Sequence, residues 1–385
     1  MKQQKFSALV LLIFFLVAGS VLANRQWTPQ DEEFDGVPIE GSIRMEVQSL
    51  ALGHHRFRFT EPSIFMESVE LNGRDWTNVD IKGEGRVWQV GAPKLPAIYR
   101  TIRLPNTGNV ELKIGKIEYD DFPDIDVLPQ VTQLEINSQG DAATFEFAFD
   151  KELYSSKIPF PELIAMVGEP AIMRDARIAV LAIHPVQYFP AERILRVYRT
   201  IELEVLPIGG VGTNEFVGPH RPVPSFASLY RDIIGAGDLV LEAEESLPGQ
   251  ILVIARNATE IRNVLQPWVD WKIASGHPVQ VYAPNGSGAS ASDLLPIIQT
   301  AYATWDPPLE FVQLVGDGGT SGNYYLPASD GSISDHGYMR LAGNDILADV
   351  SVARWSVETL PQLSTSMNRT IFYERNPHMT DTTWY

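Results

Sequence analysis

The chain of 385 residues contains no cysteine. Disulfide bonds, thiolate metal sites and a thiol nucleophile supplied by these residues are therefore excluded. Positive charge is also scarce, because 30 Lys and Arg residues stand against 48 Asp and Glu, which gives a net charge of −18. Binding to nucleic acid requires a positively charged face, so we expect no nucleic-acid partner.

Long hydrophobic runs are missing except near the start of the chain. The run Phe6–Val17 is uncharged, follows Lys2 and Lys5, and is followed by small residues before Asn24. This order of a basic region, an apolar region and a small-residue cleavage site is typical of a secretory signal peptide over residues 1–23. A membrane anchor is the alternative, but the run is short for a spanning helix. We expect a secreted protein, extracellular or on the cell surface, with no membrane span after signal cleavage.

An alternation of apolar and polar residues dominates from about residue 40 to 205, within the region 24–205 that follows the predicted signal peptide. It is clear in RFRFT from Arg56, VELKI from Val110, TFEFAF from Thr144 and TIELEV from Thr200. Alternation with period two is the pattern of strands that bury one face in an antiparallel sheet. No long helical pattern interrupts it. We predict a β-rich domain here, of β-sandwich or jelly-roll-like type.

The composition changes after this domain and the period changes again after Gln250. Residues 206–250 hold glycine, proline and acidic clusters, which predict a linker and a possible processing region. Residues 251–385 show a short continuous apolar run at 251–255 and further predicted strands at 279–282, 311–315 and 349–353, separated by helical patterns. This order predicts an α/β domain with a parallel sheet. Asp317 follows the third predicted strand, where sites form in such sheets.

The stretch SDHGYMRLAGNDILADVSVAR, from Ser334 to Arg354, looks like the lip of an active site. It brings Asp335, Asp345 and Asp349 into one short segment. His336 is interpreted as a surface histidine, because no nucleophile accompanies it. Neither a G-x-S-x-G elbow nor a P-loop lysine occurs in the chain. His54 and His55 would point to opposite faces of a strand and are not expected to share a metal.

Two blocks of sequence resemble the gingipain-type cysteine peptidases of the clostripain clan, which have a caspase-like fold. The first block contains GAPKLPAIYRTIRLP and EPAIMRDARIAVLAIHPVQYFPAERILRVYRTIELEV and resembles the propeptide of that family. The second contains ILVIA, WVDWKIASG, FVQLVGD, SDHGYMRLAGNDILADVSVARWSV and RTIFYERN and resembles the first half of the peptidase domain. The resemblance implies a propeptide followed by a caspase-like domain that is incomplete at the C-terminus.

The resemblance also implies a function for the full-length protein. In the family, a histidine in a Gly-His-Gly motif and a cysteine form the catalytic dyad, and both are expected downstream of Tyr385. No Gly-His-Gly occurs here, so no catalytic residue is assigned and the chain as given is expected to be inactive. The expected substrates are proteins and peptides, and the propeptide is expected to contact the peptidase within one chain.

One metal site follows from the same resemblance. The equivalent turn in the family binds Ca²⁺, and the matching residues here are Asp345 and Asp349 as carboxylate ligands with Ala342 and Leu347 as carbonyl ligands. Hard oxygen ligands in an irregular loop suit a structural Ca²⁺ ion. The alternative is that Asp345 makes a turn hydrogen bond without a metal.

Two other functional readings of the chain remain open. It could be a secreted non-catalytic protein that binds or inhibits a partner with the same two domains. It could also be a peptidase with a substituted nucleophile, although no activated serine or threonine beside a histidine is apparent. The sequence does not determine substrate specificity, the processing site or the oligomeric state.

Overall fold

The computed structural model describes residues 44–60, 62–130, 149–256, 258–282, 290–318, 324–329 and 334–377. The predicted signal peptide lies outside these residues. The chain divides into two compact units. The first comprises Met1–Pro170, Ala179–Val211 and Asp232–Gly235, and the second comprises Ala171–Ile178, Gly212–Arg231 and Ala236–Tyr385. Residues 171–178 therefore belong to the second unit although they fall inside the range predicted for the β-rich domain.

The first unit contains an antiparallel sheet built on a long central strand, β12 (Ile194–Gly209). The order is β1 (Arg44–Ala51), β2 (His54–Thr60), β12 and β11 (Val186–Phe189), and β7 (Asn109–Phe122) also pairs with β12. Alternation sets the register of β2, since Phe57 and Phe59 are buried. On the other face, the cross-strand pairs Arg56–Glu204 and Arg58–Glu202 join β2 to β12.

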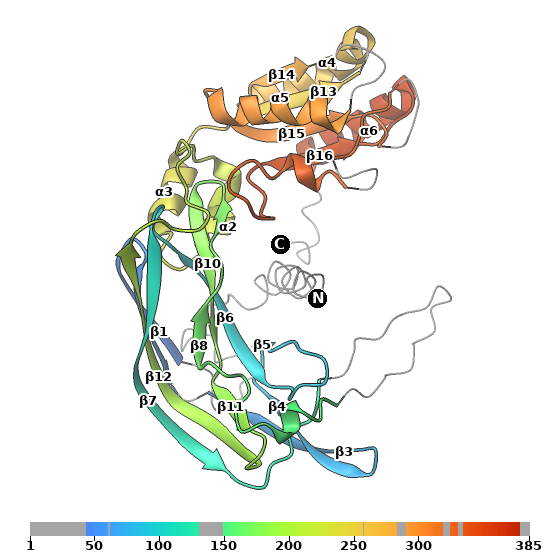
Figure 1. Cartoon of the computed structure of the whole chain (residues 1–385). Coiled ribbons are helices and arrows are strands. Elements are labelled where there is room, and N and C mark those ends of the chain that lie inside the picture. Colours follow the sequence, from blue (N-terminus) through green and yellow to red (C-terminus); the bar gives the residue numbers. More distant parts are fainter. Residues whose placement is uncertain are drawn as a thin grey trace. The chain divides into compact units, whose positions relative to one another are not determined.

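A second sheet follows the order β5 (Gly85–Arg86), β6 (Pro96–Arg103), β10 (Ala176–Ile183) and β8 (Ala165–Val167), and β9 (Ala171–Met173) also pairs with β10. A separate hairpin joins β3 (Phe65–Leu71) to β4 (Arg74–Asp80). Phe57 and Leu203 of the first sheet share one core with Ile98 and Leu181 of the second. The two layers are visible in Figure 1. The predicted β-sandwich is confirmed.

The second unit contains a four-stranded sheet in the order β14 (Val279–Tyr282), β13 (Gln250–Ala255), β15 (Leu309–Val315) and β16 (Ser351–Trp355). Every neighbouring pair is parallel. All six residues of β13 are buried, as a continuous apolar run in a central parallel strand requires. The predicted α/β domain with a parallel sheet is confirmed.

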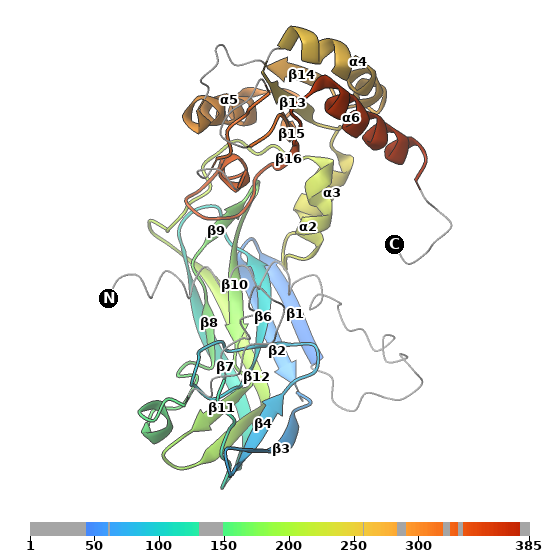
Figure 2. The same ribbon diagram turned by 90° about the vertical axis from the view of Figure 1, so that its right-hand side faces the viewer.

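Helices cover both faces of this sheet. The helices α4 (Ala258–Ala274) and α6 (Leu360–Arg375) pack on the face formed by Val253 and Val315, and α5 (Ala291–Thr304) packs on the opposite face. Figure 2 shows the sheet between them. The helix α6 begins with a capping box, in which the Thr359 side chain accepts a hydrogen bond from the Gln362 amide. A short 3₁₀ turn, η4 (His336–Tyr338), precedes β16.

Two sequence predictions differ from the structure. The segment expected to be a linker carries η3 (Pro224–Phe226), α2 (Ala227–Arg231) and α3 (Gly237–Glu245). These short helices form because Phe226, Tyr230 and Leu239 can be buried. The last strand begins at Ser351, not at Asp349, because the Asp349 amide and carboxylate bond to the preceding loop instead of to a strand.

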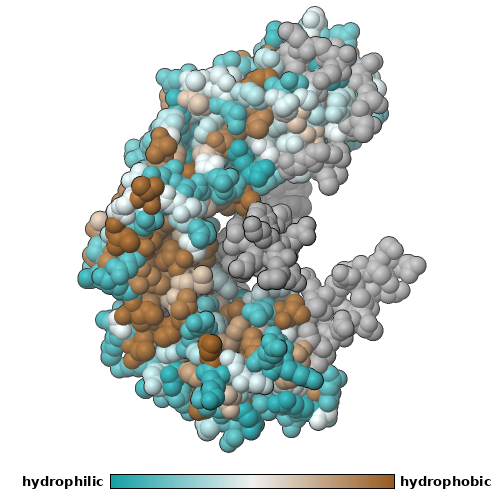
Figure 3. Space-filling model, in the orientation of Figure 1, coloured by the Kyte–Doolittle hydropathy of each residue, from teal (hydrophilic) through white to brown (hydrophobic). Residues whose placement is uncertain are grey.

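In the part of the chain that the structure describes, no helix is long and apolar enough to cross a membrane. Large hydrophobic side chains are nevertheless exposed on strands of the first unit, among them Ile117 on β7 and Met166 on β8. Figure 3 shows hydrophobic residues gathered over the strands of this unit. The surface of the first unit therefore includes exposed apolar side chains, although the chain as a whole carries a large negative charge.

Candidate functional site

Asp317 lies just beyond the carboxyl end of β15, as the sequence predicted. Its carboxylate accepts a hydrogen bond from the Ser356 hydroxyl at 2.7 Å, and Ser356 follows the neighbouring strand β16. Close by, Arg354 donates to the Gly316 carbonyl and forms a two-pronged ion pair with Asp335, at 2.7 and 2.8 Å. These side chains stabilise the loops at the carboxyl edge of the sheet.

This edge carries no complete catalytic set within the described residues. The chain has no cysteine, and the Ser356 hydroxyl hydrogen-bonds to Asp317 and to no histidine. A serine nucleophile requires a base that can take its proton, and in hydrolases this base is usually a histidine. These contacts organise the loops at this edge.

Asp345 and Asp349 do not share this edge with Asp335. Asp349 lies two residues before β16, and Arg174 links its carbonyl oxygen to that of Leu309, the first residue of β15. A strand of seven residues spans about 20 Å, so the amino and carboxyl edges are well separated. The interpretation of all three acids as one active-site lip is therefore wrong. Asp345 and Asp349 belong to a loop at the amino edge, Leu341–Asp349, here called the acid loop.

The Asp349 carboxylate is fully buried and accepts backbone hydrogen bonds at both oxygens. Its Oδ2 accepts from the amides of Leu341 and Ala342, both at 2.7 Å, and its Oδ1 accepts from the amide of Arg174 at 2.8 Å. Burial raises the pKa of Asp349 to about 6, although these three amides and their dipoles favour the charged form. The Asp349 carboxylate thus stabilises the loop that contains it and also binds the segment around Arg174, which is distant in sequence.

Asp345 is arranged in a similar way. Its Oδ1 accepts from the Leu347 amide at 2.8 Å, and its Oδ2 accepts from the Ile172 amide and the Asn214 side-chain amide, each at 2.7 Å. Gly343 makes this close approach possible. It has a φ of +69°, and an added Cβ would lie 2.7 Å from Asn214 Oδ1 and 2.8 Å from Asp345 Oδ2.

Arg174 is buried at the tip of the β9–β10 hairpin, with only 1% of its surface exposed. Its guanidinium donates to the carbonyl oxygens of Arg221, Leu309 and Asp349 at 2.9 to 3.0 Å. The rings of Phe226 and Tyr302 lie 5.3 and 5.4 Å from it, within the range of cation–π attraction. Arg174 also has a φ of +53°, a strained conformation for a residue with a side chain.

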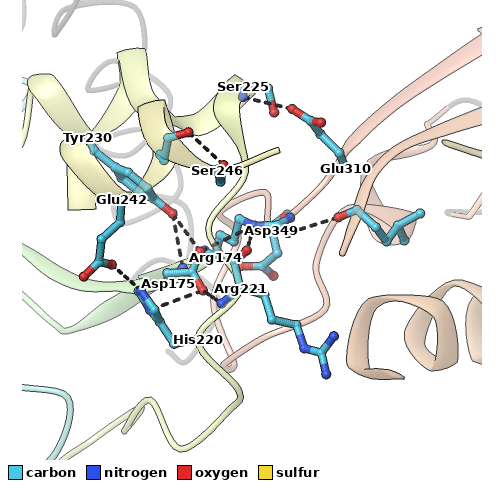
Figure 4. Close-up of polar contacts among 12 residues, drawn as sticks. Arg174, Asp175, His220, Arg221, Ser225, Tyr230, Glu242, Ser246, Glu310 and Asp349 are labelled. Atoms are coloured by element: carbon cyan, nitrogen blue, oxygen red, sulfur yellow. Dashed lines mark hydrogen bonds and ion pairs between the residues drawn. The ribbon is translucent and has the colours of Figure 1, made fainter. Parts of the chain in front are cut away.

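A second buried acid, Asp175, balances the charge at the hairpin tip. One of its oxygens accepts from the Arg221 amide at 2.7 Å, and the other lies 3.5 Å from Arg174 Nε. Tyr230 donates a long hydrogen bond to this second oxygen, and burial raises the pKa of the Tyr230 phenol. Figure 4 shows these side chains converging around Arg174. The hairpin tip is therefore held by charge, by hydrogen bonds and by aromatic packing.

Two family models match the chain, one to each of the predicted regions. The model Propeptide_C25 matches residues 45–208, and the model described as Peptidase family C25 matches residues 244–385. The chain is a gingipain-like precursor. Its family is one of cysteine peptidases, and its propeptide precedes the peptidase region, as the resemblance implied.

Relatives of this gingipain-like chain include proteins of Porphyromonas gingivalis. Gingipain R2 is 26% identical over 293 residues, which cover 74% of this chain and 38% of that protein. Lys-gingipain is 24% identical over 342 residues, covering 83% of this chain and 19% of that protein. The chain therefore spans well under half the length of these relatives. Among solved structures, a complex of the pro- and mature domains of RgpB matches with a TM-score of 0.43 and 19% identity, covering 49% of this chain and 96% of that chain.

The gingipain-like precursor makes the expected contact between propeptide and peptidase within one chain. Ile172 and Arg174 lie inside the propeptide match, whereas Asp345 and Asp349 lie inside the peptidase match. The hydrogen bonds from the first pair to the second, at 2.7 and 2.8 Å, are formed within the second compact unit.

In this arrangement the predicted Ca²⁺ ligands do not fit a metal ion. Both carboxylates already accept N–H donors at each oxygen, and Ala342 and Leu347 direct their amides at them. Throughout the described ranges, no group of three or more His, Asp or Glu side chains could hold a metal. Ca²⁺ binding by Asp345, Asp349, Ala342 and Leu347 stays a prediction. The hydrogen bonds from the β9–β10 hairpin to both carboxylates argue against it.

Sequence reasoning missed Arg174, Asp175 and Asn214 as residues of this site. A signal was present, because Arg174, Asp175 and Arg177 interrupt a mainly apolar stretch, AIMRDARIAVLAI. Charged residues in such a run are buried in pairs more often than alone. His54 and His55 behave as expected, since His54 pairs with Glu204 whereas His55 turns inward to the Arg103 carbonyl.

Proposed function

We propose that the protein to which these residues belong is a secreted cysteine-type endopeptidase made as a latent precursor. The observation that carries the proposal is the order of the two family matches, propeptide before peptidase, in a chain without a cysteine. The thiolate that attacks the peptide bond and the histidine that moves its proton would come from residues after Tyr385. Proteins and peptides would be the substrates.

On this proposal the present residues provide the scaffold and the latency element, and they have no peptidase activity by themselves. The carboxyl edge around Asp317 and Ser356 would face the catalytic residues, because sites in parallel sheets lie beyond the carboxyl ends of strands. The predicted signal peptide over residues 1–23 supports export, to the cell surface or the surrounding medium.

The test is to sequence the coding DNA beyond the Tyr385 codon and to express two proteins, the 385-residue chain and the longest open frame. Both are assayed against a labelled casein under reducing conditions, with and without a thiol alkylating agent. We expect activity only in the longer protein, abolished by alkylation and by replacing its downstream cysteine with alanine. Activity in the 385-residue chain, or none in a longer protein carrying a cysteine, would contradict the proposal.

The absence of cysteine also favours a second candidate, a secreted non-catalytic binding or inhibitory protein with the same two domains. It predicts a stop codon directly after the Tyr385 codon and an exported protein of the corresponding mass. The same sequencing experiment separates the two candidates, because only the endopeptidase requires an open frame with a histidine and a cysteine.

A further inference from the structure

Arg256 directly follows β13 and stands at the carboxyl edge of the parallel sheet. The register of the strands locates it, because Ala255 pairs with Val315, which in turn pairs with Trp355. Ser356 follows Trp355 and therefore lies two strand spacings from Arg256, about 10 Å along the edge. Sites in parallel sheets form beyond the carboxyl ends of the strands, so Arg256 is a cation placed where a ligand is expected.

The guanidinium of Arg256 is buried without hydrogen-bond acceptors. The residue is only 7% exposed. Its Nε and Nη2 atoms are shielded from solvent, and no group within the described ranges accepts a hydrogen bond from either of them. Arg256 alone among the described residues has two such atoms. A buried charge without a partner is costly, so these donors indicate a partner that the described residues do not supply.

The ring of Tyr325 lies over the guanidinium, with its centroid 5.1 Å from the Arg256 Cζ atom. Cation–π attraction acts through the face of the guanidinium, whereas its N–H groups point outward in the plane. The ring therefore offsets part of the cost of burial and leaves the donors at Nε and Nη2 without acceptors. Tyr325 is itself only partly buried, so the site lies close to the molecular surface.

A second arginine at the same edge shows which partner these donors fit. Nε and Nη2 of Arg354 hold the Asp335 carboxylate at 2.8 and 2.7 Å, while its Nη1 donates to backbone carbonyls. This edge of a guanidinium is a planar fork that matches the two oxygens of a carboxylate in parallel hydrogen bonds. In Arg256 the same two atoms are the ones without acceptors. Their geometry therefore fits a carboxylate.

The charges around Arg256 favour a carboxylate over a phosphate, which the same fork could also bind. Glu260, on the first turn of α4, is exposed and accepts a hydrogen bond from the Tyr324 hydroxyl at 3.4 Å. Its charge and the net charge of −18 repel a doubly charged phosphate more strongly than a singly charged carboxylate. The amino terminus of α4, two residues after Arg256, adds a partial positive charge that suits either anion.

We propose that Arg256 binds a peptide carboxylate at the carboxyl edge of the parallel sheet. The carboxylate accepts hydrogen bonds from Nε and Nη2, as Asp335 does from Arg354, and it enters when the Tyr325 ring turns outward. The inference rests on the proposed endopeptidase function in one respect, the identity of the ligand as an Asp or Glu side chain of the substrate. A carboxylate from this protein's own residues after Tyr385 has the same chemistry, and the experiments separate the two sources.

The first experiment measures binding to the 385-residue chain by fluorescence anisotropy. The probes are two rhodamine-labelled, terminally blocked hexapeptides of alanine and glycine, one with a central glutamate and the other with glutamine in its place. We expect the glutamate peptide to bind at least tenfold more tightly. Arg256→Gln should abolish this preference, and Arg256→Lys, which keeps the charge and loses the fork, should retain only a small part of it. Arg262→Gln, at an exposed arginine on α4, is the matched control and should leave the preference unchanged.

The second experiment distinguishes a binding residue from a structural one by urea unfolding of the same chain. Arg256→Met removes a buried charge that has no partner, so the urea midpoint should rise. Arg354→Met removes a guanidinium that is paired with Asp335, so its midpoint should fall. The glutamate peptide should raise the midpoint of the unaltered chain and leave that of Arg256→Met unchanged, because a ligand stabilises only the state that binds it.

The protein encoded by the longest open frame separates the two sources of the carboxylate. If it keeps the glutamate preference, the ligand is a carboxylate of a separate peptide. If it loses the preference and Arg256→Met lowers its urea midpoint, the guanidinium is paired with the protein's own residues after Tyr385.

The proposal fails if the 385-residue chain shows no preference for glutamate, or if Arg256→Gln keeps the preference. It also fails if Arg256→Met lowers the midpoint of this chain as Arg354→Met does, because Arg256 is then a structural residue. Since no readout uses peptidase activity, a failure here leaves the endopeptidase proposal untouched. A stop codon directly after Tyr385 would overturn that proposal and leave both experiments on the 385-residue chain decisive.

Discussion

Arg174 should be a costly arginine to remove from this chain. Replacing it with alanine leaves Asp175 buried without its ion pair and three carbonyl oxygens without their donor. Breaking a buried pair in this way costs about 3–5 kcal/mol. Urea unfolding of Arg174→Ala should show a loss of that size. Arg231→Ala is the control, since its side chain is 57% exposed and should matter by less than about 0.5 kcal/mol. Equal losses in the two variants would show that Arg174 has no special role.

Two buried histidines should make the first unit sensitive to acid. Burial lowers the pKa of both His55 and His184, in each case against a raising effect from a backbone carbonyl. The unfolded chain, whose histidines titrate near pH 6.5, therefore binds more protons than the folded chain in mildly acidic solution. Stability contributed by these residues is complete above about pH 6.5 and is lost as the pH falls below it.

The check is the urea midpoint of the first unit measured from about pH 8 to pH 5, in the unaltered chain and in His55→Gln/His184→Gln. The double variant should start less stable, because His55 loses its bond to the Arg103 carbonyl, but its stability should fall less between pH 7 and pH 5. Parallel pH curves for the two proteins would assign the acid sensitivity to carboxylates instead.

Single residues were predictable from sequence only where a local pattern surrounds them. The position of Asp317 at the end of a strand could be predicted because it follows an apolar run. The burial of Phe57 and Phe59 on one face of a strand could be predicted from the alternation. The surroundings of Arg174 could not be predicted, because charged residues within an apolar run suggest burial but do not say which groups they meet. Its environment consists of Leu309, Arg221 and Asp349, which are brought to it only by the tertiary fold.

At the scale of elements, the junction between the acid loop and the segment around Asn214 should tolerate no side chain at Gly343. Gly343→Ala would combine a left-handed φ of +69° with contacts of 2.7 and 2.8 Å to Asn214 and Asp345. Gly73→Ala is a matched control, with a φ of +71° and no atom within 4 Å of the added Cβ. It isolates the backbone strain, about 1–2 kcal/mol.

Thermal unfolding of the two variants measures the difference. Gly343→Ala should be clearly more destabilised than Gly73→Ala, and it alone should speed amide exchange at Ile172, whose partner Asp345 is displaced. If both glycine variants lose the same stability, backbone strain alone accounts for the loss, and the close contacts at Gly343 do not contribute to it.

Elements with a sustained period were predictable, and short ones were not. The parallel strands, α4, α5 and α6 follow from apolar runs and helical spacing. The helices α2 and α3 hold five and nine residues among prolines and glycines, too few to show a period. The strand β9 has three residues, and its membership in the second unit depends on contacts with the acid loop, not on its own sequence.

At the scale of the whole molecule, each unit has a core of its own. Leu203 belongs to the core of the sandwich and Leu314 to that of the parallel sheet, and both are buried. Truncating either to alanine should cost about 2–5 kcal/mol. We expect exchange to accelerate mainly in β2 and β12 for Leu203→Ala and mainly in β13 and β15 for Leu314→Ala. Uniform acceleration across the chain in both variants would show a single cooperative unit instead of two.

The order of the domains could be read from the change of period, but the path of the chain between the units could not. The alternation ends before a glycine- and proline-rich segment and the apolar runs begin after it, which suggests that one domain simply follows the other along the chain. Instead, the second unit takes in residues 171–178, and the first takes in residues 232–235. The backbone bonds between Ile234 and β6 that hold the second of these segments are long-range, and no local signal announces them.

This exchange of segments has a consequence for limited proteolysis. A single cut after Arg231 would leave two polypeptides, each with a piece built into the unit that belongs mainly to the other: residues 171–178 and 212–231 on one side, and residues 232–235 on the other. Hydrolysis of one peptide bond would not part them. The two polypeptides would separate only after Arg174 had left its buried pocket, so their dissociation would have its own half-life. Until then the cleaved protein would elute as one species in size-exclusion chromatography.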